Sequence, residues 1–143
     1  IDGDTPFDRA GRSAAQRHRA WLANNERRLQ IRERWRTFFE HYDVILMPVQ
    51  PRAAIPHDHS EPQWNRTVEI DGVERPYLDL FGRTGPAGAA FLPATVVPAG
   101  MSDDALPIGV QIVGPYLHDI TTIRAARLIS KLCGGPPRPQ AAL

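Results

Sequence analysis

The sequence has very little cysteine and lysine, with only Cys133 and Lys131. One thiol cannot form an internal disulfide, and cysteine alone cannot build a metal site here. A single cysteine fits a reducing, cytoplasmic compartment best. No apolar run approaches the ~20 residues that a membrane helix needs, and the start has no apolar signal core. Because the first residue is Ile1 rather than Met, we expect the chain to be a piece of a longer gene product.

The chain also lacks an excess of charge of either sign. Its 17 basic and 16 acidic residues give a net charge of +1, which offers no reason to expect nucleic acid or an anionic membrane as a partner. The apolar fraction of 42% is sufficient for a folded core. Fourteen prolines and eleven glycines place much of the chain in turns and loops.

The N-terminal third predicts a polar lead-in followed by one long helix. Residues 1–12 form the lead-in, and Ser13 with Gln16 has the spacing of a capping box that opens the helix. No proline or glycine interrupts the chain from there to Tyr42. The residues of one amphipathic stripe, which are apolar or aromatic except for Asn25, recur at steps of three and four: Trp21, Leu22, Asn25, Leu29, Trp35, Phe38, Phe39 and Tyr42. The other faces are rich in arginine. This favours a solvated face, or one that packs on acidic residues elsewhere in the full-length chain, over an RNA-binding or partner-binding face.

The rest of the chain alternates strands and turns. The apolar run 44–49 predicts a buried strand, and Asp71-Gly72 predicts the turn of a hairpin over 67–77. Residues 77–81 predict a helical turn that Gly82 stops. Segments 91–97 and 108–113 predict an antiparallel pair, and Asp119 predicts the cap of a last helix over 120–132.

The groups needed for nucleophilic catalysis are not brought together by any sequence motif. The four serines are Ser13, Ser60, Ser102 and Ser130, and none lies in a glycine-rich elbow. Lys131 complements the dipole of the last helix, and Cys133 is expected to be a buried structural thiol. The cluster His57-Asp58-His59 could hold a metal, but consecutive residues converge poorly on one ion, which favours a loop turn stabilised by the Asp58 side chain.

Four blocks of the sequence resemble the closing part of amidase-signature enzymes. They are HYDVILMPVQPRAAIPHDHS (41–60), TVEIDGVERPYLDLF (67–81), FLPATVVPAG (91–100) and LPIGVQIVGPYLHDITTIRAARLI (106–129). The resemblance implies an α/β fold in which this chain supplies the C-terminal portion of an incomplete mixed sheet, with a long N-terminal helix and a C-terminal helix. The implied domain organisation is a lead-in at 1–12, the amidase portion at 13–134 and a flexible tail at 135–143.

The family hydrolyses carbon–nitrogen amide bonds without a metal or organic cofactor. Its nucleophilic Ser, its second Ser in a cis peptide and its Lys lie in a Gly/Ser-rich segment that this chain does not match, so no catalytic residue carries over. By position, the resemblance implies that Tyr77, Phe81 and Phe91 line the substrate pocket. Residues 81–86 depart from the family pattern, and two glycines and a proline predict a loop there.

The leading hypothesis is a C-terminal amidase fragment that is inactive in isolation. Its partners are then the upstream part of the same enzyme and, in the full-length protein only, a small-molecule amide. Exposed strand edges predict self-association. The alternatives are a non-catalytic, amidase-like domain that binds a partner, and part of the A subunit of a tRNA-dependent amidotransferase.

Overall fold

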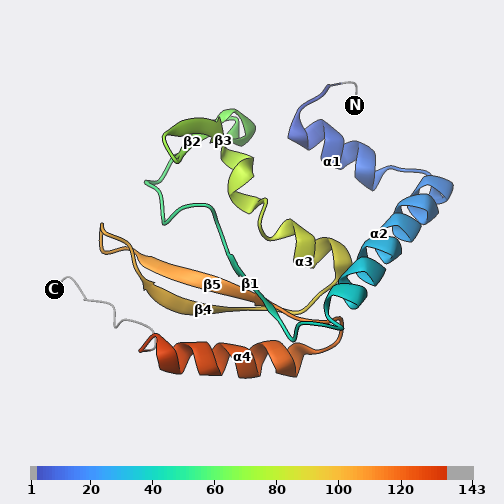
Figure 1. The fold of residues 1–143 in the computed structure, drawn as a ribbon. Helices are drawn as coiled ribbons and strands as arrows, with labels where there is room; N and C mark the ends of the chain where they lie inside the picture. The colour runs from blue at the N-terminus through green and yellow to red at the C-terminus, as the bar shows by residue number, and fades with distance from the viewer. Residues whose placement is uncertain (1–2, 135–143) are drawn as a thin grey trace.

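The computed structural model describes residues 3–134, which form a mixed α/β structure (Figure 1). In chain order, the elements of this range are α1 (Pro6–Ala14), α2 (His18–Phe38), β1 (Ile45–Pro48), the 3-10 turn η1 (Gln63–Asn65), β2 (Thr67–Ile70), β3 (Val73–Pro76), the 3-10 turn η2 (Tyr77–Phe81), α3 (Gly85–Ala90), β4 (Ala94–Met101), β5 (Pro107–Val113) and α4 (Asp119–Leu132). The predicted tail at 135–143 lies outside the described residues.

Residues Pro6–Ala14 form the helix α1, so the prediction that the first helix opens at Ser13 is wrong. Thr5 caps α1: its side chain accepts a hydrogen bond from the Asp8 N–H at 3.2 Å, and the Asp8 carboxylate accepts one from the Thr5 N–H at 3.1 Å. This is a capping box with Asp in the place of Glu. Ser13 is not a cap, since it lies in the last turn of α1 and donates to the Arg9 carbonyl.

Helix α2 uses only the C-terminal half of its aromatic stripe for packing. Trp35 and Phe39 stack on each other at 5.8 Å between ring centroids and contact the core. Trp21 and Leu22, near the other end, are each 49% exposed. The prediction of one long helix from Ser13 to Tyr42 is therefore wrong in its bounds, since the chain leaves the helix between Ala14 and His18 and α2 ends at Phe38. Burial of the whole stripe is not found either.

The larger sheet has the order β1-β5-β4, with both pairings antiparallel. The predicted pairing of 91–97 with 108–113 is confirmed, with Ala94 opposite Val113. Helix α4 covers one face, where Val97, Ile112 and Ala126 form a core cluster. Helix α3 and the end of α2 cover part of the other face around Val113 and Leu92.

Both outer strands of this sheet are unpaired on one side within residues 3–134 (Figure 1). Leu46 on β1 is 53% exposed and Val96 on β4 is 54% exposed. The prediction of a buried strand over 44–49 is therefore wrong for this chain, because β1 lies at an edge and half of its side chains face away from the core.

Strands β2 and β3 form a separate hairpin, as predicted. Asp71 and Gly72 both adopt positive φ, at 52° and 75°, which is the backbone of a type I′ turn. The helical turn predicted at 77–81 is confirmed as η2.

The prediction of a loop over 81–86 holds for residues 82–84, which form a turn between η2 and α3, and is wrong for Gly85 and Pro86. Helix α3 begins at Gly85 with Pro86 in its first turn, where a missing N–H has no cost. The helix closes on Phe91, which adopts the left-handed conformation at φ 56° and ψ 38°. The Leu92 N–H then donates to the Ala87 carbonyl at 3.0 Å.

Helix α4 is held to the sheet by a buried hydroxyl pair. Thr122 is 1% exposed, donates to the Asp119 carbonyl at 2.8 Å and lies 2.8 Å from the Thr95 hydroxyl. Asp119 is the first residue of α4 and is not its N-cap. The N-cap is His118, whose side chain makes no capping hydrogen bond.

Cys133 is exposed rather than buried, because it follows the helix end beside the solvent-exposed Leu132. None of the helices in the described range combines the length and apolarity needed to span a bilayer.

Candidate functional site: three surface hollows

The structure brings two of the three predicted pocket residues together and separates the third. Tyr77 and Phe81 both lie on η2, and their rings meet edge to face at 5.9 Å. Phe91 lies beyond α3 and contacts α2 instead. The three side chains therefore do not share one pocket within this chain.

The hollow at Tyr77, about 250 Å³ in volume, is bounded by the loop of 55–59. The Asp58 carboxylate accepts a hydrogen bond from the Ser60 N–H at 2.8 Å, and bonding to Ser60 lowers the pKa of Asp58. This confirms the predicted turn. The rings of His57 and His59 lie 5.9 Å apart. Nowhere in residues 3–134 do three or more His, Cys, Asp or Glu side chains gather as metal ligands.

The hollow at Phe91, about 520 Å³ in volume, lies along the first half of α2. We call it the Phe91 hollow, and it is lined by Gln16, Trp21, Asn24, Asn25, Arg28 and Phe91. The Arg28 guanidinium lies over the Phe91 ring, 4.2 Å from its centroid. Asn25 fixes that guanidinium by accepting from Nε at 3.1 Å and from Nη2 at 2.7 Å.

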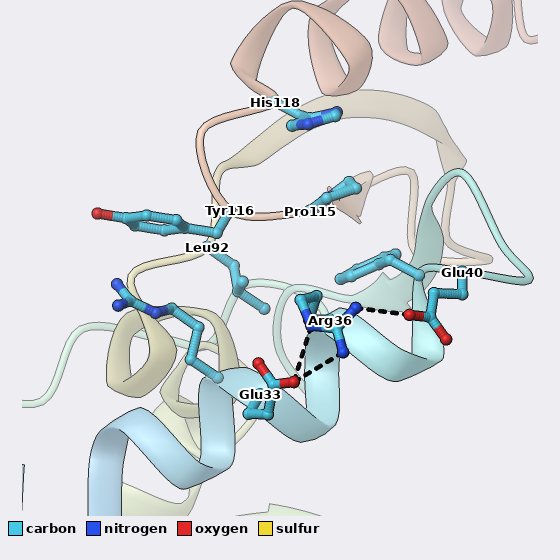
Figure 2. Close-up of a pocket in the computed structure, with 9 residues that line it drawn as sticks. Glu33, Arg36, Glu40, Leu92, Pro115, Tyr116 and His118 are labelled. Atoms are coloured by element: carbon cyan, nitrogen blue, oxygen red, sulfur yellow. Dashed lines mark hydrogen bonds and ion pairs between the residues drawn. The ribbon is translucent and has the colours of Figure 1, made fainter. Parts of the chain in front are cut away.

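A third pocket, about 360 Å³ in volume, lies between the end of α2 and the loop before α4 (Figure 2). Leu92 and Phe39 supply apolar walls, while Tyr116 and His118 come from the loop. The Arg32 guanidinium lies 4.0 Å from the centroid of the Tyr116 ring. Sequence reasoning missed this pocket, although Arg32 and Arg36 lie one helical turn apart and Gly114-Pro115 predicts a turn opposite them.

Charges in this third pocket largely cancel. Arg36 pairs with Glu33 at 2.7 Å and with Glu40 at 2.5 Å, and Figure 2 shows it between the two carboxylates. These bonds raise the pKa of Arg36, and the bond from Arg36 lowers the pKa of Glu33. With Arg32, the pocket therefore holds two cations and two anions, which gives no net attraction for a charged ligand.

The described hydrogen bonds of the serines hold turns and helix ends. The Ser102 hydroxyl accepts from the Leu106 N–H in the β4–β5 turn. Among the hydrogen bonds of the described residues, none joins Lys131 to a serine hydroxyl. These three hollows, which lie within residues 3–134, therefore offer side chains that can bind a ligand and wall a pocket.

Comparison with known proteins places the chain in a family. A sequence model of the Amidase family matches residues 5–123. The A subunit of glutamyl-tRNA(Gln) amidotransferase from Rhodospirillum rubrum is 31% identical over 119 residues, which is 83% of this chain and 22% of that protein. The chain belongs to the amidase-signature family.

Solved structures share the fold of this chain. An amidase crystal structure superposes with a TM-score of 0.71 at 22% identity, over 93% of this chain and 30% of that one. The A subunit of glutamyl-tRNA(Gln) amidotransferase from Thermotoga maritima superposes with a TM-score of 0.62 at 32% identity, over 81% of this chain and 24% of that one. The chain thus spans about a fifth of the length of the curated relatives it matches.

Proposed function

We propose that the chain is the C-terminal portion of an amidase that hydrolyses carbon–nitrogen amide bonds, and that the catalytic Ser–cis-Ser–Lys set lies outside these residues. The observation that carries the proposal is the family match over residues 5–123, in a chain that spans only 22% of its R. rubrum relative. In this proposal the protein works in the cytoplasm, in agreement with its single cysteine.

The open sheet gives this proposal a physical basis. Strands β1 and β4 each leave one row of backbone groups without a strand partner in the described range, and Leu46 and Val96 expose apolar surface beside them. Such edges pair readily with further strands. In the complete enzyme, the strands that pair with β1 and β4 come from the remainder of the amidase fold. In the isolated chain, strands of a second copy pair with these edges instead.

Tyr77, Phe81 and Phe91 are proposed to wall the substrate pocket of the complete enzyme. Each side chain has exposed aromatic surface or lines a hollow in this chain. The Tyr77–Phe81 pair and Phe91 contact the substrate from different sides, because the structure separates them.

The test of the proposed function uses the coding sequence upstream of Ile1. We expect an open frame that encodes a Gly/Ser-rich segment with two serines and a lysine. We expect the longer product to release ammonia from simple amides while the 143-residue chain does not. Turnover by the 143-residue chain would overturn the proposal, most directly if it is lost when one of the four serines is replaced by Ala.

The A subunit of a tRNA-dependent amidotransferase is a second candidate, favoured by the relatives at 31% and 32% identity that carry this name. Co-expression of the longer product with candidate companion subunits separates the candidates. A stable complex favours the amidotransferase, and hydrolysis by the product alone favours the free-standing amidase. A stable complex without any hydrolysis favours a non-catalytic domain that binds a partner.

A further inference from the structure

A buried amide side chain lies beside the apolar core of the larger sheet. Gln111 lies on β5, the central strand of that sheet, and is 4% exposed. Alternate residues of a strand share a face, so Gln111 lies on the same face as Val113, which belongs to the core beneath α3. Burial of an amide costs free energy unless the amide forms hydrogen bonds. An apolar side chain would avoid that cost, which indicates that this amide has a specific partner.

The partner of the Gln111 amide is the turn between η2 and α3. Its Nε2 atom donates to the Arg83 carbonyl at 3.4 Å, across 28 positions of the sequence. Among the hydrogen bonds described for residues 3–134, this is the only one that joins residues 77–91 to the three-stranded sheet. The bond is long, and its importance comes from its place, because it connects the central strand to a segment outside the sheet.

The turn has few other polar contacts that fix its position. Thr84, the N-cap of α3, makes no capping hydrogen bond, since its hydroxyl donates to the Phe81 carbonyl at 2.8 Å. Helix α3 has only six residues, and so short a helix depends on packing for its stability. Ala87 and Ala90 hold the later part of α3 in the core. Gln111 holds the turn that precedes it.

This turn forms part of one wall of an open hollow at the edge of β1. The hollow has a volume of about 700 Å³, and its lining includes Met47 and Pro48 on one side and Leu78 and Gly82 on the other. Gln111 stands directly opposite Met47 in the pairing of β1 with β5. One residue of β5 therefore connects both walls of the hollow, through the strand ladder on one side and through its side chain on the other.

From these observations we infer that Gln111 is a positioning residue. Its amide fixes the turn at Arg83 against β5 and so sets the position of η2, which carries Tyr77 and Phe81. For its effect on a substrate the inference rests on the proposed function, because Tyr77 and Phe81 are proposed to wall the pocket of the complete enzyme. Its structural part is testable without that function.

Hydrogen exchange followed by mass spectrometry on the 143-residue chain tests the bond. Gln111→Met keeps a flexible side chain of similar size but removes the N–H donors. We expect the protection of residues 77–88 to fall about tenfold, as suits the loss of one buried hydrogen bond. Ile112→Val is the matched control, because it weakens the next buried position of β5 on the opposite face and should not lower protection selectively at 77–88. Circular dichroism verifies that both variants fold.

Gln111→Glu adds a pH-dependent readout. A carboxylate cannot donate to the Arg83 carbonyl, whereas a protonated carboxyl group can donate its O–H. Burial raises the pKa of a carboxyl group. Protection of residues 77–88 in this variant should therefore be near the wild-type value at about pH 5 and about tenfold lower at about pH 8. Wild-type protection in Gln111→Met, or protection in Gln111→Glu that is the same at both pH values, would overturn the inference.

Hydrolysis of benzamide by the longer product tests the consequence for a substrate. We expect Gln111→Met to raise KM about tenfold and to change kcat less than about twofold, because a displaced wall weakens binding without removal of a catalytic group. An unchanged KM in a variant that has lost protection at 77–88 would overturn the positioning role. Absence of turnover by the longer wild-type product would contradict the proposed function instead, and hydrogen exchange would still decide whether Gln111 holds the turn.

Discussion

Replacement of Gly114 by Ala tests how tightly α4 is docked on the sheet. A Cβ atom on Gly114 would lie 2.6 Å from the Thr122 Cγ2 atom, well inside the ~3.5 Å of normal carbon contact. Thr122 cannot rotate away without loss of its bonds to Thr95 and Asp119. Either α4 shifts or the bonds break, and overpacking of this kind costs about 1–3 kcal/mol. Urea unfolding followed by circular dichroism measures the change.

The contact between Gly114 and Thr122 also predicts that Thr122→Ser rescues the stability of Gly114→Ala. Thr122→Ser removes the clashing methyl group, keeps the hydroxyl, and by itself costs about 1 kcal/mol of buried apolar contact. In its presence Gly114→Ala should cost little more, which gives a coupling of about 1–2 kcal/mol in a double-mutant cycle. Gly88→Ala is the control, because its Cβ meets nothing within 4 Å and a helical alanine should stabilise by about 0.5–1 kcal/mol. Additive effects of Gly114→Ala and Thr122→Ser would refute the proposed contact.

Three further predictions concern local features of the fold. Phe91→Gly should be more stable than Phe91→Ala by about 1 kcal/mol in urea unfolding, since only alanine keeps the left-handed strain, and the reverse order would contradict that conformation. The Asp58 carboxyl should titrate by NMR with a pKa below its ordinary value of 3.8 and move back toward that value in Ser60→Ala, whose side chain no longer bonds it. Because the folded pKa is the lower one, the stabilisation is present above pH 3.8 and lost as the pH falls through the folded value. Thr5→Ala should cost about 1 kcal/mol of α1 stability, seen as faster amide hydrogen exchange in residues 6–14 with unchanged exchange in α4.

Local signals in the sequence predicted the hairpin and the helical spacing well. Asp71-Gly72 specifies a turn with two positive φ angles whatever surrounds it, and the structure has that turn. The antiparallel pair β4–β5 followed from a short connection between two apolar runs. Thr5 and Asp8 carried the signal for α1, although none of the residues of this helix is buried in the structure.

Tertiary contacts explain most of what the sequence could not predict. β1 joins β5 rather than β4. Within the apolar run 44–49, Pro48 favours an edge strand, because proline has no N–H to donate to a neighbouring strand. A bulky residue such as Phe91 is disfavoured at a left-handed position, so local preference argues against the conformation that it adopts. The Arg32–Tyr116 contact joins residues far apart in the chain, and no spacing rule relates them.

The central claim is that this chain contributes an open sheet to a larger amidase fold. Sedimentation velocity of the 143-residue chain, from micromolar to hundreds of micromolar, tests it most directly. The account predicts a sedimentation coefficient that rises with concentration as the edges of β1 and β4 pair with other copies, and a smaller rise for Val96→Lys, which places a charge beside the β4 edge. A single monomeric boundary at every concentration would contradict it.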